Sequence, residues 1–438
     1  MKWKYIPIDE IKSAKKYSLV GGPFGSDLTG EHYVDSGVPV IRGTNLPFDQ
    51  KFRHDDFVFV TNEKANKLIS NTAYPGDLIF TQRGTLGQVG IVPSGCFDRY
   101  IISQSQMKLT VDPEKADPLF VYYYFRTKQC VAMMENLALQ SGVPHINLGI
   151  LKRFKIPSPP LNVQRKISFI LSAYDDLIEN NKRRIKLLEE MAEEIYNEWF
   201  VRFRFPGYES VRFFDEKGKE VQHGISGALP EGWEIQPFDK VAEYVNGFAF
   251  KPTDWGDNGL PIIKINELKN GVEASTPRND GHNIPKKYHV YQGDLLFSWS
   301  ADLNVYIWNE GNGLLNQHIF KVVPNPEIPK GFLFYSLKSK MVSFRGMSNG
   351  ATMHHIKKSA LSTVHLNVPT MSIMNKFQSI TEPMMTNIGV LKSKTRLLQE
   401  IRDLLLPRLV SGKLSVERLH ENEGDSFALA AEPDLTYG

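Results

Sequence analysis

The sequence is poor in cysteine and has no long apolar run. Its 438 residues include two cysteines, Cys96 and Cys130, which form no CxxC pair and stand in no His/Cys pattern typical of zinc ligands. Neither a disulfide framework nor a metal site is indicated, and a reducing cytoplasm fits best. No stretch reaches the length of a membrane span or an export leader, so we expect no membrane partner.

The signatures of two kinds of enzyme are also missing. The chain has no GxxxxGK[S/T] phosphate loop for ATP, and no [N/D]PP[Y/F] run to hold an extrahelical adenine in a methyltransferase pocket. Its acidic residues form no convincing metal-binding pattern. The sequence therefore predicts no catalytic residue. An independent nuclease stays an alternative, because acidic residues far apart in a sequence can still cluster in space.

The overall composition is typical of a packed globular protein. Hydrophobic residues make up 41% of the chain and charged residues 23%. A chain of this length exceeds one ordinary core and predicts two or three domains. The net charge is +3 and the pI is about 8.5, too weakly basic for phosphate binding over the whole surface. Charge alone does not establish a nucleic-acid ligand.

An internal duplication decides how the chain is organised. Four segments recur in the same order: residues 37–46 as 259–268, 75–80 as 292–297, 120–127 as 332–339, and 155–157 as 367–369. The offset between the copies falls from 222 to 212 residues along the chain, so insertions and deletions lie inside the globular parts. We expect two copies of one fold with diverged surfaces.

A long amphipathic pattern follows each copy. Residues 161–205 contain no Pro or Gly, and apolar side chains recur there at steps of three, four or seven. An offset of 210 gives the second stripe, in which Pro383 and Gly389 predict a kink or a late start. We expect an antiparallel coiled coil in which inter-helix packing involves Ile167, Ile170, Tyr174, Ile178, Leu188 and Ile195 with Phe377, Ile380, Met384, Ile388, Leu398 and Leu405.

The globular parts combine strands and helices. Short β-branched and aromatic runs between turn residues predict strands, for example at 38–41, 57–60 and 78–80. Helices are predicted near 119–138 and 330–341, so the fold class is α+β: two repeated α+β domains separated by the two long helices. We place the first domain at 1–160, its helix at 161–205, a linker at 206–232, the second domain at 233–370, its helix at 371–414, and a disordered tail at 415–438.

Several motifs resemble those of one family. The closing run RDLLLPRLVSGKL at 402–414 resembles the C-terminal signature of type I restriction-modification specificity subunits. Residues 22–28 (GPFGSDL), the Gly-Asp-Leu runs of both halves and residues 315–318 (LNQH) resemble that family's recognition domains. The resemblance covers the chain from about residue 3 to 414. It implies two target-recognition domains, each of which recognises one half of a split double-stranded DNA target.

The resemblance also implies partner enzymes. Two methyltransferase (M) subunits, which use S-adenosylmethionine to methylate adenine, would dock on the helices. Restriction (R) subunits would use ATP and Mg to translocate and cut DNA. The chain itself would be a non-catalytic subunit that binds no cofactor and directs these partners to an asymmetric bipartite target. The alternative function is a coiled-coil assembly scaffold whose end domains bind proteins instead of DNA.

Polar side chains that follow two strands of the first half are candidate DNA contacts. Arg42, Thr44 and Asn45 follow one strand, and Gln82 and Arg83 follow the Gly-Asp-Leu strand. Arginine can pair with the edge of guanine, and asparagine or glutamine with the edge of adenine. The alternative for the first group is a turn in which Asn45 tolerates unusual backbone angles and Arg42 makes a surface ion pair.

The second half offers different side chains at the matching positions, so the two half-sites should differ. The candidate base contacts are Lys264, Asn266 and Ser298. Trp299 also follows the matching strand, and we interpret it first as a core aromatic. The basic cluster His354, Lys357 and Lys358 provides candidate phosphate contacts, for which a solvated charged surface is the alternative.

Overall fold

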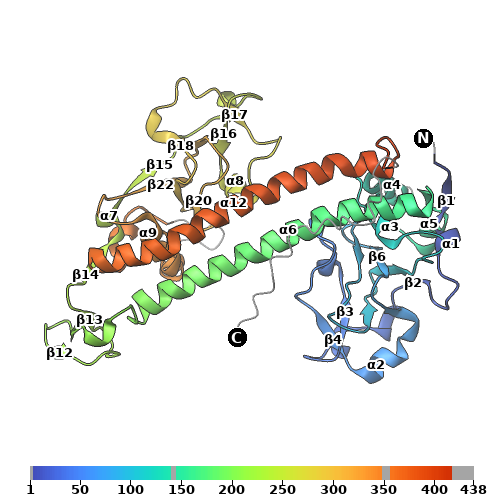
Figure 1. Ribbon diagram of the computed structural model, residues 1–438, viewed down its shortest axis with the longest axis horizontal. Coiled ribbons are helices and arrows are strands. Elements are labelled where there is room, and N and C mark those ends of the chain that lie inside the picture. Colours follow the sequence, from blue (N-terminus) through green and yellow to red (C-terminus); the bar gives the residue numbers. More distant parts are fainter. Residues whose placement is uncertain (1–2, 140–144, 348–355, 417–438) are drawn as a thin grey trace, which may run out of the picture. The chain divides into compact units, whose positions relative to one another are not determined.

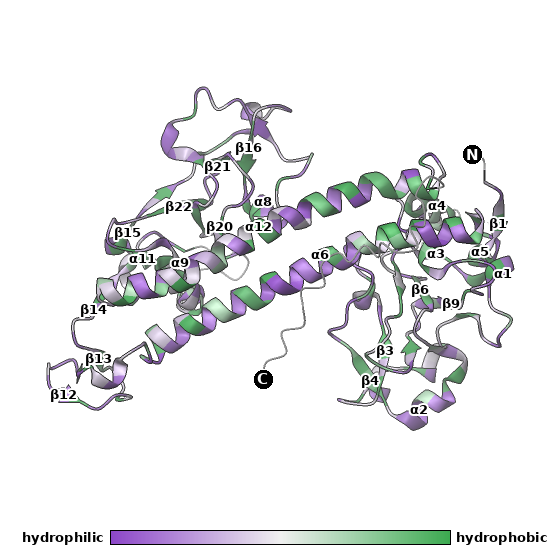
Figure 2. Ribbon diagram, viewed as in Figure 1, coloured by the Kyte–Doolittle hydropathy of each residue, from purple (hydrophilic) through white to green (hydrophobic). Residues whose placement is uncertain are grey.

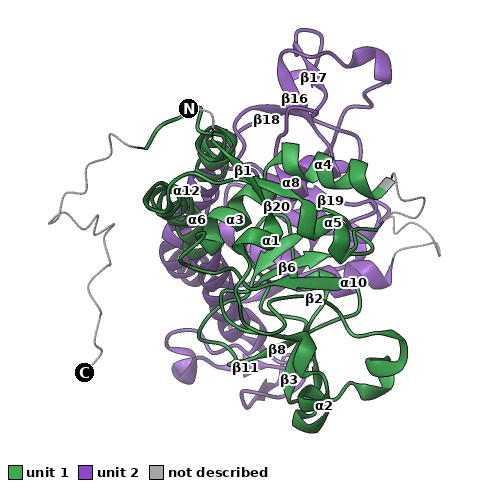
Figure 3. Ribbon diagram, turned by 90° about the vertical axis from the view of Figure 1, so that its right-hand side faces the viewer, with its two compact units in different colours: residues 1–180, 397–438 green, residues 181–396 purple. Residues whose placement is uncertain are grey.

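A computed structural model gives the fold and describes residues 3–139, 145–347 and 356–416. The chain divides into two compact units (Figure 3). Unit 1 comprises residues 1–180 and 397–438, and unit 2 comprises residues 181–396. Each contains one globular domain together with one segment from each of the two long helices.

The domain of unit 1 is built on two four-stranded sheets (Figure 1). One sheet is antiparallel and has the order β2 (Leu19–Gly21), β9 (Gln106–Leu109), β6 (Leu78–Thr81) and β7 (Val89–Ile91). The other has the order β4 (Val58–Val60), β3 (Val38–Ile41), β8 (Tyr100–Ile102) and β5 (Thr72–Ala73), with β3 and β8 parallel. A further pair joins β1 (Tyr5–Pro7) to β10 (Lys155–Pro157). The helices are α1 (Ile8–Ile11), α2 (Asn62–Lys67), α3 (Pro118–Phe125), α4 (Lys128–Leu139) and α5 (Leu148–Arg153).

Unit 2 repeats this topology strand for strand. Its antiparallel sheet has the order β15 (Ala242–Asn246), β22 (Ile319–Pro324), β19 (Leu295–Ser298) and β20 (Asn304–Ile307). Its mixed sheet has the order β17 (Arg278–Asn279), β16 (Leu260–Ile263), β21 (Gly313–Leu315) and β18 (His289–Val290), with β16 and β21 parallel. The remaining pair is β14 (Glu234–Pro237) with β23 (His365–Val368). The helices are α7 (Phe238–Val241), α8 (Ile265–Asn270), α9 (Lys330–Ser339), α10 (Met341–Gly346) and α11 (Ala360–Thr363). The prediction of duplicated α+β domains is confirmed.

The Gly-Asp-Leu motif of each half is structural. The carboxylate of Asp77 accepts the Tyr74 backbone N–H at 2.8 Å and the Thr110 hydroxyl at 2.6 Å, and lies 3.7 Å from the ammonium of Lys108. In unit 2 the carboxylate of Asp294 accepts the Tyr291 backbone N–H at 2.9 Å and lies 3.0 Å from the ammonium of Lys321. Burial raises the pKa of Asp77, and the charge of Lys108 opposes that shift. The motif therefore closes the turn that starts β6 and β19.

The two long helices are α6 (Leu161–Tyr196) and α12 (Met371–Val410). A short π-helical turn at Asn197–Val201 follows α6. Apolar and polar residues alternate along both (Figure 2). In unit 2 they pair antiparallel, because Glu189 contacts Lys392 at 2.9 Å while Tyr196, further along α6, packs on Phe377 at the earlier end of α12. Of the kink or late start predicted for the second helix, the late start is wrong, since α12 runs without interruption through Pro383 and Gly389, and the kink stays a prediction.

The predicted packing positions differ in burial. Ile167, Ile178, Phe377 and Ile388 are buried, and Ile170, Tyr174, Leu188, Ile195, Met384, Leu398 and Leu405 are partly buried. The prediction that Ile380 packs between the helices is wrong, because this residue is 39% exposed and the buried residue beside it is Thr381. A Cβ placed on Gly331 would lie 3.4 Å from the Thr381 hydroxyl, so α9 approaches α12 where a small side chain is needed.

Two boundary predictions are also corrected. The segment predicted as a linker contains a small three-stranded sheet of β11 (Phe213–Phe214), β12 (Glu220–Val221) and β13 (Leu229–Pro230). The tail was predicted to start at residue 415, but Val416 is buried in the core of unit 1. The rest of the predicted tail, from residue 417, lies outside the described residues. Among the described helices, none combines the length and the apolar character that crossing a membrane requires.

Candidate nucleic-acid interface

Four loops of unit 1 meet at one edge of its domain. The segment 103–106 ties them together: the Ser103 N–H donates to the carbonyl of Ile41 at 3.0 Å, and the carbonyl of Ser105 accepts the Gln82 N–H at 2.7 Å. The carbonyl of Gln106 accepts the Gly22 N–H at 2.8 Å. We call loops 22–28, 42–45, 82–88 and 103–105 the loop edge of unit 1. The two candidate segments of the first half are therefore neighbours, although about 40 residues separate them in the sequence.

The same hydrogen bonds build a loop edge in unit 2. The Asn316 N–H donates to the carbonyl of Ile263 at 3.1 Å, and the Trp299 N–H donates to that of His318 at 3.3 Å. The Gly247 N–H donates to the carbonyl of Ile319 at 3.1 Å. This edge consists of loops 247–254, 264–266, 299–303 and 316–318. Each unit thus presents one polar loop edge on a common framework.

Arg83 and Thr44 are exposed on the loop edge of unit 1, and Gln82 is half-buried. The guanidinium of Arg83 makes no hydrogen bond or ion pair with any residue that the structure describes. A planar donor fork in this state is available to an incoming ligand, and it matches the acceptor pair of a guanine edge. As DNA contacts, these three residues remain predictions.

The prediction that Asn45 contacts DNA is corrected, because this residue is fully buried and holds the turn at residues 42–45. Its side-chain oxygen accepts the Arg42 backbone N–H at 2.9 Å, and its amide donates to the carbonyls of Arg53 at 3.3 Å and Asp55 at 3.1 Å. Arg42 is half-buried and its guanidinium lies 3.1 Å from the carboxylate of Asp56. The alternative of a turn with a surface ion pair therefore describes Arg42, whereas Asn45 holds the turn through its side-chain hydrogen bonds rather than through unusual backbone angles.

The matching turn of unit 2 uses other residues. Glu267 replaces Asn45, is buried, and accepts the Lys264 backbone N–H at 3.0 Å. The ammonium of Lys264 lies 3.8 Å from the centroid of the Trp255 ring, a cation–π contact. Asn266 is exposed, like Thr44 at the equivalent position. The divergence predicted between the two halves therefore lies at the loop edges themselves.

The prediction that Ser298 contacts DNA is wrong. Ser298 is fully buried in β19, and its hydroxyl donates to the carbonyl of Ser300 at 3.2 Å. The Trp299 indole donates to the side chain of Asn246 at 3.1 Å, and its ring centroid lies 5.8 Å from that of Phe320. Trp299 is half-buried and packs against the core of unit 2, which agrees in part with its interpretation as a core aromatic.

Lys357 and Lys358 are exposed beside the loop edge of unit 2. The preceding residue, Ile356, donates its backbone N–H to the carbonyl of Trp299 at 3.0 Å. In unit 1 the bond from Ile146 to Gln82, at 3.1 Å, occupies the equivalent position. His354 lies outside the described residues. The two lysines thus add positive charge next to the loops that the repeat brings together.

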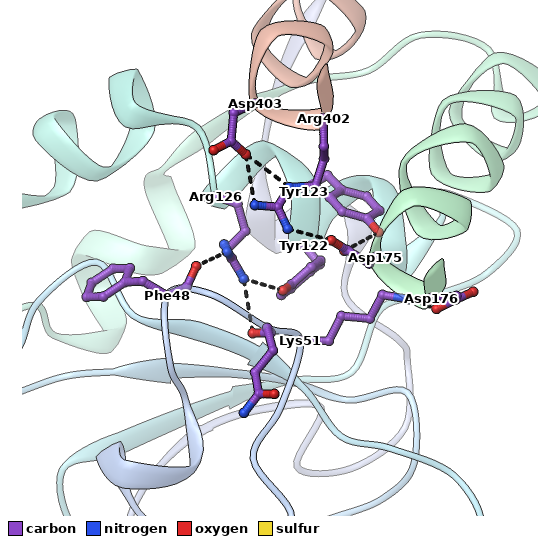
Figure 4. A network of polar contacts seen from close by, with 10 residues as sticks. Phe48, Lys51, Tyr122, Tyr123, Arg126, Asp175, Asp176, Arg402 and Asp403 are labelled. Atoms are coloured by element: carbon purple, nitrogen blue, oxygen red, sulfur yellow. Dashed lines mark hydrogen bonds and ion pairs between the residues drawn. The ribbon is translucent and has the colours of Figure 1, made fainter. Parts of the chain in front are cut away.

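A polar network that the sequence did not predict holds loop 46–53 of unit 1 (Figure 4). The guanidinium of Arg126 donates to the carbonyls of Phe48 and Gln50, the latter at 3.1 Å, and to the Tyr122 hydroxyl at 2.5 Å. The ammonium of Lys51 lies 2.6 Å from the carboxylate of Asp176 on α6. The loop directly after the Arg42–Asn45 turn is therefore fastened to α3 and α6.

Within the ranges that the structure describes, no cluster of three or more His, Cys, Asp or Glu side chains could hold a metal ion. The described framework instead defines a class of protein: duplicated α+β domains that carry polar loop edges and are connected by antiparallel helices. A sequence model described as "Type I restriction modification DNA specificity domain" matches residues 29–190 and 230–399. The chain belongs to this family, and its function is DNA sequence specificity in a type I restriction-modification system.

Similar proteins support this assignment over nearly the whole chain. The MjaIX specificity subunit of Methanocaldococcus jannaschii is 25% identical over 432 residues, which cover 94% of this chain and 95% of the relative. The HindI specificity subunit of Haemophilus influenzae is 23% identical and covers 86% and 94%. The crystal structure of an S subunit from M. genitalium has the same fold, with a TM-score of 0.58, 15% identity and coverage of 93% and 96%.

Proposed function

We propose that each loop edge recognises one half of a split double-stranded DNA target. The observation that carries this proposal is the repeated framework with unlike side chains: Thr44, Gln82 and Arg83 in unit 1 stand where unit 2 has Asn266, Trp299 and Ser300. Identical edges would read identical half-sites, whereas unit 1 exposes Thr44 and Arg83, and unit 2 exposes Asn266 and buries Ser300 at the position of Arg83. The target is therefore asymmetric as well as bipartite.

The exposed groups divide between two tasks. Arg83 and Gln82 carry the donors and acceptors that distinguish guanine and adenine in the major groove, so they specify bases. Lys357 and Lys358 are flexible point charges, which suit phosphate oxygens and so position the domain without reading sequence. Binding should accordingly weaken as salt rises, because bound phosphates release counterions.

The chemistry belongs to partner subunits in this proposal. Two methyltransferase subunits dock on the helices and use S-adenosylmethionine, and restriction subunits use ATP and Mg, all in the cytoplasm. The chain contributes no catalytic residue and binds no cofactor. Exposed apolar side chains on the helices support docking: Leu397 and Leu404, seven residues apart on α12 in unit 1, are 56% and 62% exposed, and Leu187 and Met191 on α6 in unit 2 are 49% and 52% exposed.

Adenine methylation in living cells tests the proposal. Cells that express the chain with its methyltransferase partner are expected to show one split, asymmetric methylated motif, and cells that express the methyltransferase alone are expected to show none. A purified complex that forms but methylates no motif and binds DNA without salt dependence would contradict DNA reading and favour the assembly scaffold. Cleavage of DNA by the purified chain with Mg alone would contradict the non-catalytic role.

A further inference from the structure

Phe24 is the most exposed large apolar side chain in the described part of the chain. Its side chain is 86% exposed, and it stands in loop 22–28 of the loop edge of unit 1. A phenyl ring in water forgoes the favourable burial that most phenylalanines in folded proteins obtain. A single exposed apolar residue on a mobile loop would need no explanation. Whether the exposure of Phe24 points to a function therefore depends on how firmly its loop is held.

Loop 22–28 is held firmly while Phe24 projects from it. The side-chain amide of Gln104 donates to the carbonyls of Gly25 and Leu28, both at 2.6 Å. A Cβ on Gly22 would lie 2.0 Å from the carbonyl oxygen of Ser103, so the backbone there packs too closely for any other residue. Gly25 adopts a φ of +44°, and the ring of Pro23 is buried. The backbone of the loop is therefore packed against the domain, while the phenyl ring of Phe24 projects into solvent.

The position of the loop identifies its ligand. Gly21 precedes the loop and lies against the side chain of Gln82, since a Cβ on Gly21 would be 3.7 Å from the Gln82 amide oxygen. A duplex that Gln82 and Arg83 contact therefore lies close to the start of the loop from which Phe24 projects. The loop has no basic residue and one acid, Asp27, so it brings no positive charge to the phosphates. The phenyl ring of Phe24 cannot donate a hydrogen bond to a phosphate, and the contact that its chemistry permits is an apolar one with the faces of the bases.

Unit 2 lacks this feature. Gly247 is the equivalent of Gly22, because a Cβ there would also lie 2.0 Å from a backbone oxygen, that of Asn316. The position matching Phe24 is then Ala249. Its aromatic neighbours pack on each other, with ring centroids of Phe248 and Phe250 at 4.9 Å, and of Phe248 and Tyr288 at 5.5 Å. At this position of the repeat only the first domain has an exposed ring, and the exposed aromatic of unit 2 near its loop edge, Trp255 (45% exposed), is instead covered on one face by the ammonium of Lys264.

We infer that Phe24 inserts its ring against a base step of the half-site that unit 1 reads and partly unstacks that step. The inference rests on the proposed DNA-reading function and deepens it: one half-site is distorted by an apolar wedge, and the other is not. Wedges of this kind kink a duplex and exact a deformation cost that depends on the base step. Phe24 would thereby add sequence preference at a position where no hydrogen bond is made.

Fluorescence of 2-aminopurine tests the inference, because the base brightens when it unstacks. The probes are duplexes of the methylated motif with 2-aminopurine in one half-site or the other, placed away from the adenine that the methyltransferase extrudes and its neighbours, and bound by the complex of the chain with its methyltransferase partner. We expect brightening in one half-site only. Phe24→Ala should abolish it and weaken binding about tenfold, and Phe24→Trp should retain both. Ile225→Ala removes a 52% exposed apolar side chain outside the long helices and the loop edges and should change neither.

Three outcomes overturn the inference. Unchanged brightening and affinity in Phe24→Ala would show that Phe24 does not insert between bases. Equal brightening in both half-sites of the wild-type complex would contradict the difference between the units. Loss of the methyltransferase subunit from the Phe24→Ala complex would assign the ring to a protein partner. A wild-type complex that fails to bind the motif at all would instead contradict the proposed function, and so the two failures are distinguishable.

Discussion

The guanidinium of Arg402 on α12 lies 2.7 Å from the carboxylate of Asp175 on α6, and both side chains are 10% exposed. The other oxygen of Asp175 accepts the Tyr123 hydroxyl at 2.7 Å, so one carboxylate joins both long helices to α3 of the recognition domain (Figure 4). Arg402 begins the closing run of the chain that resembles the family signature. The run therefore has a structural role in unit 1.

Asp175→Ala is expected to destabilise the chain by about 3 kcal/mol, because the Tyr123 hydroxyl loses its partner and the buried Arg402 guanidinium keeps only the exposed Asp403. Urea unfolding of the chain measures the loss. Asp403→Ala is the matched control: Asp403 also contacts Arg402, at 2.9 Å, but is 58% exposed, and its loss should cost less than about 1 kcal/mol. Equal, small effects of both substitutions would show that the buried pair contributes little.

Arg126→Ala should release loop 46–53. The substitution removes the donors to the carbonyls of Phe48 and Gln50, and two hydrogen bonds of about 1 kcal/mol each correspond to faster local opening by at least about tenfold. Hydrogen exchange of the amides of residues 46–53 measures that opening. Lys128→Ala, an exposed site two residues further on, should leave the exchange unchanged. Unaltered protection in Arg126→Ala would mean that other contacts hold the loop.

Alkaline pH should weaken the same region. Burial raises the pKa of Tyr122 to about 12, with the Arg126 charge opposing, whereas an unfolded tyrosine titrates near 10. Stability from keeping this phenol neutral is complete below pH 10 and is lost as the pH rises toward 12, by about 2–3 kcal/mol. Urea midpoints between pH 9 and 11.5 should fall less steeply in Tyr122→Phe than in wild type. Tyr74→Phe, at a 49% exposed site, should keep the wild-type slope, and identical slopes in all three would contradict the assignment.

Replacing Lys357 and Lys358 with alanine should weaken DNA binding equally for target and non-target sequences. If each lysine neutralises one phosphate, the slope of log Kd against log salt concentration falls by about 2. Lys217→Ala with Lys219→Ala removes the same charge from an exposed turn of unit 2 and should leave the slope unchanged. A loss confined to the target sequence would instead make Lys357 and Lys358 base contacts.

Much of the fold could be predicted because it depends on periodic patterns. The duplicated motifs gave the order of the domains, and the strands at 38–41 and 78–80 follow from short apolar runs between turns. The helices follow from apolar stripes. The prediction for Ile380 was wrong because the residue that turns inward at that point of α12 is Thr381, which is fully buried and donates its hydroxyl to the carbonyl of Phe377 at 3.0 Å. A constant offset from the first helix cannot show this.

Polar residues of the candidate site were harder to predict. Asn45 and Ser298 both follow or end a strand, where a short polar side chain can turn inward to satisfy backbone groups or outward to a ligand, and both turn inward. The network of Arg126, Asp175 and Arg402 joins three segments far apart in the sequence, and no local pattern marks it. Phe24 lies in a motif that was recognised, but its exposure depends on hydrogen bonds from Gln104.

The central claim is that two loop edges read two half-sites independently. Motif-resolved methylation in cells that carry the methyltransferase partner with Arg83→Ala or with Asn266→Ala tests it most directly, with Arg165→Ala on α6 as the control for an exposed charge. The account predicts that each of the two substitutions relaxes base preference in one half of the motif, a different half for each, while Arg165→Ala changes neither. Relaxation of the same half by both substitutions, or of both halves by either one, would contradict it.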